Sequence, residues 1–371
     1  MKIGVPKEIM TGEARVALTP VACKTLAETG CGIYLEKGAG AGSGYSDDDY
    51  INAGVSVVDT AAQLYESSQL IVKVKQPLVE DLALLRSHHV LFSYLHLAAD
   101  VSLVQTLCDI GVIAIPFESV KDELETLPLL TPMSQIAGRI ATMRGASLLF
   151  RNSGGRGILL GGVDGSESGR VVVLGAGVAG SQAAAVAVAL GAKVDVLDLD
   201  KSKLQLLALK YPLITTHMST PETVDSLCFD ADLVVGAVLL AGRRAPVVLK
   251  QSTIKRMKKG SVIVDIAIDQ GGCVEGVRAT SSDQLCYIEN GVVHSAVPNM
   301  PATVARTASQ SLSVAILPYV ELLAREDADI LDKPDCPHAM ALQRAVAIKA
   351  GDVVDKILQD EISSKKAHSA A

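Results

Sequence analysis

The chain has 371 residues, of which 49% are hydrophobic, 20% charged and 3% aromatic, with no Trp. This length is typical of two domains, and an apolar content dominated by Ala, Val, Leu and Ile favours helices packed on a sheet over an all-β sandwich. The net charge of −7 and the lack of a long basic run argue against a nucleic-acid partner.

The sequence also gives expectations about membranes, compartment and metals. The N-terminal MKIGVPKE lacks the apolar core of a signal peptide, and no run approaches about 20 apolar residues, so we expect neither a leader nor a membrane span. The seven cysteines are scattered and form no C-x-x-C pair. We therefore expect reduced thiols, a cytoplasmic protein and no metal site.

Short β-rich runs alternate with helix-like segments in the first part of the chain. Such alternation predicts a parallel sheet with helices on both faces. The expected strands are residues 2–6, 32–36, 55–58, 70–75, 90–96 and 112–116, and helix candidates include residues 20–29, 77–86 and 100–110.

From Gly169 the alternation starts again, which predicts a second domain of the same class. Its expected strands lie in RVVVLGAG, AKVDVLD, LITTHM, ADLVVGAV, SVIVDIAI and GVVHSAV. Two long helices are expected to connect the domains, one with Ser134 as candidate N-cap and one interrupted by a kink at Pro318. The tail, residues 343–363, is expected to form a helix that returns to the first domain.

The segment VVVLGAGVAGSQ has the spacing G-x-G-x-x-G at Gly175, Gly177 and Gly180, between an expected strand and an Ala-rich helix. The first glycine permits a tight turn, the second lets the backbone approach a pyrophosphate, and the third lets the helix pack closely on the strand. The helix N-terminus offers free N–H groups to the phosphates. A glycine-rich turn that binds nothing is the alternative interpretation.

Asp198 ends the next expected strand, where a carboxylate can accept hydrogen bonds from the adenosine ribose, and this favours NAD over NADP. Asp200 is the competing acidic residue, and Lys203 could reach a 2′-phosphate, which leaves NADP open. The expected fold is α/β, with two Rossmann-like doubly wound domains, mostly parallel sheets and two long connecting helices. The first domain comprises residues 1–130 plus 305–371 and the second residues 131–304.

Three charged residues follow expected strands of the first domain: Arg15, Lys75 and His96. Arg and Lys suit a small carboxylate substrate, because Arg can bind it through two parallel hydrogen bonds. Histidine titrates near neutral pH, so His96 could move protons. The structural alternatives are that Lys73 and Lys75 face solvent, that His96 is structural and that Arg15 is an exposed loop residue. Four histidines rank below His96: His88 and His89, interpreted as surface residues, and His217 and His294, interpreted as strand residues.

An apolar strand at residues 262–264 leads into two aspartates, Asp265 and Asp269. An isolated carboxylate is expensive to bury without a partner. Either the two aspartates brace a turn, or one of them takes part in chemistry.

Nine segments, in the same order along essentially the whole chain, resemble the alanine dehydrogenase family. They are KIGVPKEI…RVALTP, LIVKVKQPL, YLHLAAD, LLTPMSQIAGR, GGRGILLGGVDG, LGAGVAG, DLVVGAVLLAGRRAP, GSVIVDIAIDQGGCVEGVRATS and VPNMPATVARTAS. The resemblance implies an NAD-dependent oxidoreductase that converts L-alanine reversibly to pyruvate and ammonium. It also implies a homohexamer of two-domain subunits.

Matched residue by residue, the resemblance implies that Arg15 and Lys75 bind the substrate and that Met133 covers it. It implies that His96 and Asp269 are catalytic. Besides the three glycines of the motif, the implied cofactor-binding residues are Ser134, Val178, Ala179, Asp198, Lys203, Ser219, Val238, Leu239, Ile266, Asp269, Arg278, Asn299 and Met300.

The nucleotide-binding part of proton-translocating nicotinamide nucleotide transhydrogenase is the alternative that the resemblance leaves open. That relative shares much of the fold, does no chemistry on an amino acid and lacks the catalytic aspartate. The alternative function is therefore NAD(H) binding without amino-acid chemistry. The resemblance makes Asp269 the chemical carboxylate, and Asp265 is expected to be structural and bonded to neighbouring backbone.

Overall fold

The computed structural model describes residues 1–238, 244–281 and 284–369, with side chains described as far as residue 363. The chain divides into two compact units. Unit 1 comprises Met1–Met133 and Ala302–Ala371, and unit 2 comprises Ser134–Pro301. Each unit has a mostly parallel sheet covered by helices, so the α/β fold class predicted from the sequence is confirmed.

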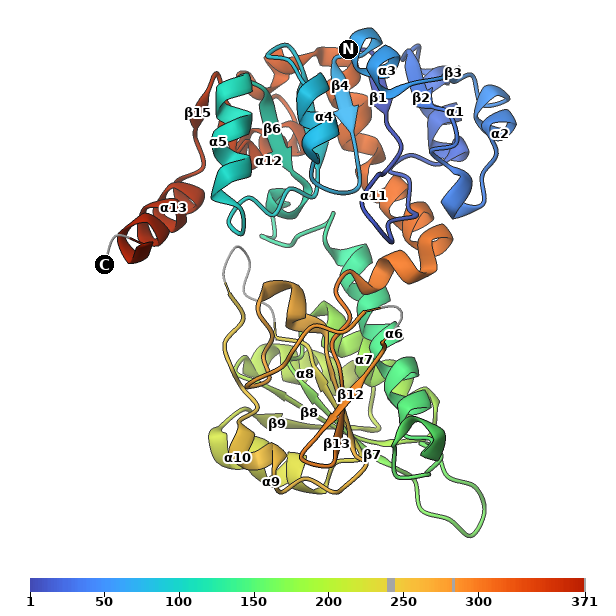
Figure 1. Cartoon of the computed structure of the whole chain (residues 1–371), viewed down its shortest axis with the longest axis vertical. Coiled ribbons are helices and arrows are strands. Elements are labelled where there is room, and N and C mark those ends of the chain that lie inside the picture. Colours follow the sequence, from blue (N-terminus) through green and yellow to red (C-terminus); the bar gives the residue numbers. More distant parts are fainter. Residues whose placement is uncertain (239–243, 282–283, 370–371) are drawn as a thin grey trace. The chain divides into compact units, whose positions relative to one another are not determined.

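The described residues of unit 1 form an eight-stranded sheet in the order β15-β14-β6-β5-β4-β1-β2-β3 (Figure 1). The six strands β1 to β6 pair in parallel, and β14 and β15 add an antiparallel edge. The strand bounds are β1 Ile3–Val5, β2 Ile33–Glu36, β3 Ser56–Val58, β4 Leu70–Val72, β5 Val90–Ser93, β6 Ile113–Pro116, β14 Ile348–Lys349 and β15 Asp352–Val353.

The helices of unit 1 begin where the sequence supplies capping groups. Helix α1 begins at Pro20, whose missing N–H is not needed in a first turn. Asp100 caps α5 by accepting hydrogen bonds from the N–H groups of Ser102 and Leu103. The bounds are α1 Pro20–Glu28, α2 Asp47–Ile51, α3 Ala61–Ser67, α4 Val79–Leu84, α5 Val101–Ile110, α11 Ala305–Glu326, α12 Pro337–Ala345 and α13 Lys356–Ser369.

The prediction of a single helix over residues 343–363 is wrong. Helix α12 ends at Ala345, and a short hairpin of β14 and β15 precedes α13. The reversal contains Ala350 and Gly351 at φ +53° and +85°, a left-handed conformation that a continuous helix does not adopt. Because Ile348 pairs with Ala114 of β6, the tail extends the sheet of unit 1, and its predicted return to the first domain is confirmed.

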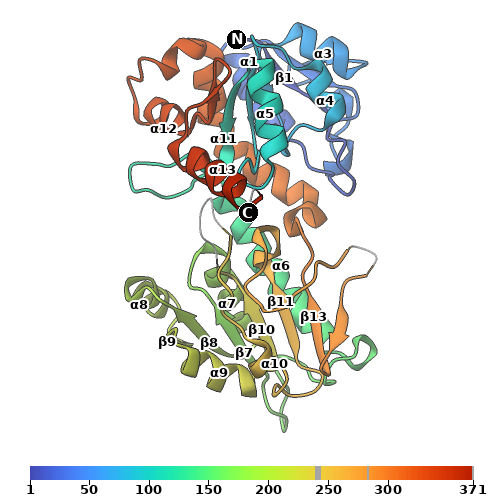
Figure 2. The same ribbon diagram turned by 60° about the vertical axis from the view of Figure 1, so that its left-hand side comes forward.

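The described residues of unit 2 form a seven-stranded sheet in the order β12-β13-β11-β10-β7-β8-β9 (Figure 2). All pairs are parallel except the edge pair of β12 with β13. The strand bounds are β7 Arg170–Leu174, β8 Lys193–Asp198, β9 Ile214–Met218, β10 Leu233–Gly236, β11 Val262–Asp265, β12 Tyr287–Glu289 and β13 Val292–Ser295.

Helices cover this sheet and bury its continuous Val and Ile runs. The central strands are buried on both faces, as expected of a parallel sheet between helices. Small residues let α7 lie close to the sheet, and Ala183, Ala184 and Ala187 are buried there. The helix bounds are α7 Val178–Ala189, α8 Lys201–Lys210, α9 Pro221–Asp230 and α10 Gln251–Ile254.

The chain passes between the units at two places. The first passage lies in helix α6, Thr131–Leu148, and the second in the 3₁₀ helix η5, Met300–Val304, directly before α11. Ser134 is not the N-cap of α6, because the helix begins three residues earlier and Pro132 fits its first turn. Helix α11 continues through Pro318, with buried residues on both sides, so the predicted interruption of the helix is wrong, and the kink stays a prediction.

Among the helices that the structure describes, none has the length and apolar content needed to cross a membrane.

Candidate functional site

Three charged candidates of unit 1 follow strands at one edge of its sheet. Arg15 lies in the segment after β1, Lys75 follows β4, and His96 follows β5. These three strands are adjacent and parallel, so their carboxyl ends meet at the same edge. This is the edge at which open α/β sheets bind their ligands.

Arg15 is buried, with 3% exposure, so its interpretation as an exposed loop residue is wrong. Glu13 holds the guanidinium: Nε donates to Oε1 at 2.7 Å, and Nη2 donates to Oε2 at 2.6 Å. The Nη1 of Arg15 lies 3.2 Å from the Sδ of Met133. The two parallel hydrogen bonds to Glu13 fix the plane of the guanidinium, and Arg15 contacts Met133, the other residue of unit 1 that the resemblance assigns to the substrate together with Lys75.

Lys73 is also buried, so its interpretation as a solvent-facing residue is wrong. Its Nζ lies 3.0 Å from Oδ2 of Asp81 and 3.7 Å from Oε2 of Glu8. The other oxygen of Glu8 accepts from the N–H groups of Val74 at 2.6 Å and Lys75 at 3.4 Å. Burial raises the pKa of Glu8, and the Lys73 ammonium opposes this rise. This buried carboxylate therefore fixes the backbone that carries Lys75.

His96 has a half-exposed imidazole and a left-handed backbone with φ +49°. Its backbone N–H donates to Oε1 of Glu118 at 2.6 Å, and the same oxygen lies 3.9 Å from Nδ1. The ring of Tyr94 lies parallel to the imidazole at 6.3 Å between centroids. Burial raises the pKa of Tyr94, whose hydroxyl donates to the carbonyl oxygen of Leu129 at 2.5 Å, so this phenol is a neutral wall beside the histidine.

His89 is buried, and its interpretation as a surface residue is wrong. Its Nδ1 accepts from the N–H of Arg86, and its Nε2 lies 2.9 Å from the carbonyl oxygen of Tyr65. Burial lowers the pKa of His89, so these bonds belong to a neutral, structural imidazole. His217 and His294 lie in β9 and β13, as predicted.

In unit 2, the G-x-G-x-x-G segment lies between β7 and α7, as predicted. Gly175 has φ +106°, which favours glycine. A Cβ on Gly180 would lie 1.8 Å from the carbonyl oxygen of Gly175, whereas a Cβ on Gly177 would meet no atom within 4 Å. The first N–H groups of α7, at Val178 and Ala179, have no acceptor within a helix. A bare backbone facing open space at a helix N-terminus fits a pyrophosphate.

Asp198 is the last residue of β8 and is bonded to the glycine loop. Its Oδ2 accepts from the N–H of Ala176 at 2.6 Å, and its Oδ1 accepts from the N–H of Asp200 at 2.8 Å. Asp200 instead caps α8 through the N–H groups of Ser202 and Lys203. The structure therefore gives the competing carboxylate a helix-capping role, and Lys203 lies 3.9 Å from it.

Five further cofactor candidates lie beyond the carboxyl ends of the parallel strands of unit 2: Ser219 after β9, Val238 after β10, Ile266 after β11, and Asn299 and Met300 after β13. Together with the glycine loop and Asp198, they follow six parallel strands at one edge of the sheet.

Two further cofactor candidates, Ser134 and Arg278, do not directly follow a strand of this sheet. Ser134 lies in α6, and Leu239 lies outside the described residues. Arg278 lies between β11 and β12, with its guanidinium 4.3 Å from the ring centroid of Tyr287 and 3.3 Å from a carboxylate oxygen of Glu289.

The two aspartates after β11 have separate environments. Asp265 is buried, and its carboxylate accepts from the N–H groups of Ala267 at 2.9 Å, Cys273 at 2.9 Å and Val274 at 3.1 Å. The expectation that it is bonded to neighbouring backbone is confirmed. Asp269 is exposed in the 3₁₀ helix η4, Ile266–Gln270, and both its oxygens lie 3.2 Å from the N–H of Asn299.

Sequence reasoning missed four residues of unit 1 that hold or lie beside the candidate groups: Glu8, Glu13, Tyr94 and Glu118. Glu118 follows β6, the neighbour of β5, so a systematic search of strand ends would have found it. Glu13 stands two positions before Arg15, and only the fold shows that both are buried. Across the residues that the structure describes, no three His, Cys, Asp or Glu side chains gather as metal ligands.

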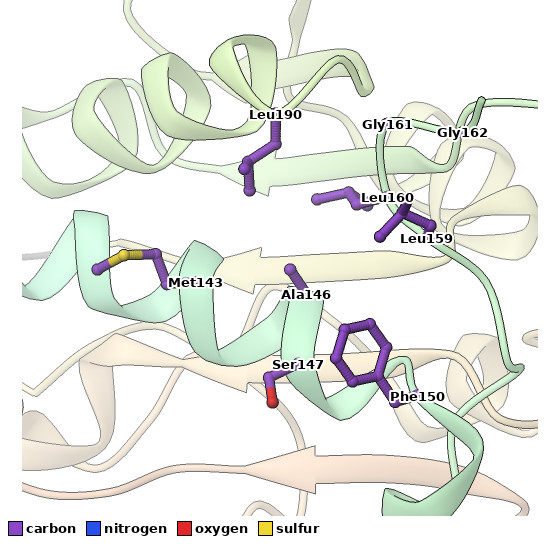
Figure 3. Close-up of a pocket in the computed structure, with 9 residues that line it drawn as sticks. All are labelled: Met143, Ala146, Ser147, Phe150, Leu159, Leu160, Gly161, Gly162 and Leu190. Carbon is purple, nitrogen blue, oxygen red and sulfur yellow. The ribbon is translucent and has the colours of Figure 1, made fainter. Parts of the chain in front are cut away.

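Unit 2 also has an apolar hollow of about 410 Å³ at the far end of α7 from the glycine loop (Figure 3). Its walls come from α6, residues 159–162 and the end of α7. Large apolar side chains around it are exposed: Met143 at 52%, Phe150 at 44%, Leu159 at 56% and Leu190 at 43%. This hollow is separate from the strand ends that carry the cofactor candidates.

Profiles of two families match nearly the whole chain. The family described as alanine dehydrogenase/PNT, N-terminal domain, matches residues 4–137, and the one described as alanine dehydrogenase/PNT, C-terminal domain, matches residues 141–356. An alanine dehydrogenase of Bacillus subtilis is 46% identical over 330 residues, which cover 88% of this chain and 87% of that protein. One of Methanococcus maripaludis is 43% identical over 328 residues, 88% of both chains.

Solved structures give the same result at the level of the fold. A structure titled L-alanine dehydrogenase superposes with a TM-score of 0.93 at 43% identity, covering 98% of this chain and 99% of its own. A transhydrogenase from Sinorhizobium meliloti superposes with a TM-score of 0.80 at 24% identity, covering 96% and 99%. Because the two sequences are only 24% identical, this similarity shows that the transhydrogenase has the same fold and does not indicate a shared activity.

Proposed function

Because the chain belongs to the alanine dehydrogenase/PNT family and is an amino-acid dehydrogenase that uses a nicotinamide nucleotide, we propose that its reaction is the reversible oxidative deamination of L-alanine to pyruvate and ammonium with NAD. The observation that carries the proposal is the match to a solved L-alanine dehydrogenase over 98% of the chain at 43% identity. The transhydrogenase-like alternative has weaker support, because the solved transhydrogenase is 24% identical and shares the fold.

The choice of NAD rests on the end of β8. The carboxylate of Asp198 is directed at the glycine loop through Ala176 and can also accept bonds from ribose hydroxyls. A negative charge there repels the 2′-phosphate of NADP, and the alternative acidic residue, Asp200, is already engaged as a helix cap. When bound, the nicotinamide nucleotide supplies the hydride acceptor for the α-hydrogen of alanine.

Arg15 and Lys75 are proposed to bind the substrate carboxylate. A carboxylate brings two oxygens, and two cations at one edge of the sheet suit its charge. Glu13 and Glu8 hold the guanidinium and the Lys75 backbone in place, which limits the entropy lost on binding. Orientation of the substrate in this way can contribute about 7–11 kcal/mol to lowering the barrier.

His96 is proposed as the general base and acid. In the oxidative direction, water adds to the carbon of the substrate imine, and the imidazole takes the proton that this water loses. In the return direction it gives that proton back, and such transfer contributes about 10²–10⁴-fold. The exposed carboxylate of Asp269 is proposed to stabilise the cationic substrate nitrogen and to accept its proton. Met133, in contact with Arg15, is proposed to cover the substrate methyl group.

Variants at the two proposed catalytic positions test these roles. His96→Ala is expected to bind NADH with unchanged affinity, and both His96→Ala and Asp269→Asn are expected to lose at least about 10²-fold in turnover. Gln343→Ala, a change at a side chain bonded within the C-terminal segment, is the control and is expected to retain turnover. Wild-type turnover in either catalytic variant would remove that residue from the mechanism.

The assembly is proposed to be a homohexamer in the cytoplasm. The seven cysteines are unpaired, which supports a reducing compartment. The exposed apolar side chains gathered around the hollow of unit 2 offer a surface that another subunit could cover. Leu159→Glu is expected to lower the molar mass measured by light scattering, whereas Leu124→Glu, a change at an exposed leucine of unit 1, is expected to leave it unchanged. A hexamer that survives Leu159→Glu would contradict the use of this surface.

A further inference from the structure

The backbone of His96 has an unfavourable conformation for a residue other than glycine. Its φ of +49° lies in the left-handed region, which a side-chain Cβ disfavours. Such a conformation persists when the surroundings hold it, and it is frequent at functional sites. The direction of the imidazole depends on this backbone, so the groups that hold it also aim the side chain.

The carboxylate of Glu118 holds this backbone on its N-terminal side, and on the other side the carbonyl oxygen of His96 accepts from the N–H of Ala99 at 2.8 Å. Its Oε1 accepts from the N–H of His96 at 2.6 Å, and its two oxygens lie 3.2 and 3.3 Å from the N–H of Leu95. Two consecutive backbone donors therefore point at one carboxylate. These bonds fix the peptide group between Leu95 and His96, from which the Cα of His96 and its imidazole project.

Glu118 is held in place by the packing of the short helix in which it lies. It lies in the 3₁₀ helix η2, Phe117–Ser119, directly after β6. The neighbouring Phe117 is fully buried and packs edge-on against the rings of Phe92, at 4.4 Å between centroids, and Tyr94, at 5.1 Å. These aromatic contacts join the support of Glu118 to the strand that carries His96.

We propose that Glu118 is a positioning residue whose carboxylate locks the peptide group that leads into His96 and so aims the imidazole for proton transfer. The inference rests on the proposed function for its catalytic consequence, and on the contacts above for the lock itself. Both the reach of the side chain and its acceptor oxygens matter, because the carboxylate must meet two backbone donors.

Three variants separate positioning from the effect of charge. Glu118→Gln keeps the length and one acceptor oxygen but loses the charge. Glu118→Asp keeps the charge but is one methylene too short to reach the same donors. Positioning predicts that kcat falls less than about tenfold in Glu118→Gln and about 10²-fold in Glu118→Asp and Glu118→Ala. The dissociation constant of NADH is expected to stay unchanged, as it is in the control Glu123→Gln, a change at an exposed carboxylate of the following loop.

A double-mutant cycle with His96→Ala tests whether Glu118 acts through the histidine. If it does, Glu118→Asp lowers kcat about 10²-fold in the wild type and leaves kcat nearly unchanged in the His96→Ala background. An equal loss in both backgrounds would overturn the inference. The inference would also be overturned if Glu118→Asp retained more activity than Glu118→Gln. The charge of residue 118, rather than the length of its side chain, would then determine the activity.

Hydrogen exchange tests the lock independently of activity. The amide of His96 is expected to exchange at least about tenfold faster in Glu118→Asp than in the wild type, with no change in Glu123→Gln. Unchanged exchange would overturn the inference, even if turnover fell. Absence of amino-acid oxidation by the wild type, with the exchange difference present, would contradict the proposed function and leave the structural lock supported.

Discussion

Two glycines of the cofactor loop differ in what an added methyl group would meet. At Gly180 it would lie 1.8 Å from the carbonyl oxygen of Gly175, so the helix and the loop must separate by more than about 1 Å to reach a normal contact. At Gly177 it would meet no protein atom within 4 Å. The backbone there has φ −68° and ψ −169°, which alanine adopts without strain.

We therefore predict that Gly180→Ala destabilises the protein by about 1–3 kcal/mol, the usual cost of overpacking. Gly177→Ala is expected to change stability by less than about 1 kcal/mol, because reduced freedom in the unfolded chain offsets a poorer helix cap. Both variants are expected to weaken NADH binding at least about tenfold, or 1.4 kcal/mol. In Gly180→Ala the α7 N–H groups move, and in Gly177→Ala the methyl group occupies the space that we assign to the pyrophosphate.

Thermal unfolding measures the stability of each variant, and titration of NADH fluorescence measures binding in a chain that has no Trp to interfere. Gly32→Ala in unit 1, where the methyl group would make one ordinary contact at 3.6 Å, is the matched control and is expected to bind NADH normally. Normal NADH binding by Gly177→Ala would refute the reasoning, because the pyrophosphate would then not approach this backbone.

Further predictions concern the carboxylates of unit 2 and the buried histidines. Asp198→Asn should lower the ratio of kcat/KM for NAD to that for NADP by at least about tenfold; an unchanged ratio would place the ribose contact elsewhere. Asp265→Asn should lower the free energy of unfolding by about 1–3 kcal/mol, measured in urea, because an amide cannot accept from all three backbone donors; full stability would contradict its bracing role. Burial lowers the pKa of His89 and of His294 in the folded protein. As the pH falls, the two imidazoles are therefore protonated in the unfolded chain at a higher pH than in the folded chain. Their contribution to stability is thus fully present above about pH 6.5 and is lost progressively below it, and a urea midpoint that stays constant from pH 7 to 5 would contradict this.

The parts of the fold that follow from local pattern could be predicted from the sequence. The six parallel strands that the described part of each unit contains, and the glycine loop, have strong local signals, since apolar β-rich runs and glycine spacing are properties of neighbouring residues. The structural role of Asp265 could also be predicted, because its hydrogen-bond partners, such as Cys273, lie a few residues away in the sequence.

Burial of charged residues could not be predicted, because it depends on partners that are distant in the sequence. From the sequence alone Lys73 resembles an exposed strand residue, but in the fold Glu8 and Asp81 lie beside its ammonium group. His89 likewise resembles a surface residue, but in the fold its Nε2 contacts the carbonyl oxygen of Tyr65. The hairpin of β14 and β15 has strands too short for a pattern and exists because Ile348 can pair with the edge of β6. In the same way, the contact of Glu118 with His96 requires β5 and β6 to be neighbours.

The central claim is that this chain oxidises L-alanine with NAD. Its most direct test follows the absorbance of NADH formed at alkaline pH with L-alanine and, separately, with glycine, L-serine and L-leucine. Rapid NADH formation is expected with L-alanine, and pyruvate plus ammonium is expected to reverse it. Binding of NADH without NADH formation from any of these amino acids would contradict the claim and favour a nucleotide-binding protein without amino-acid chemistry.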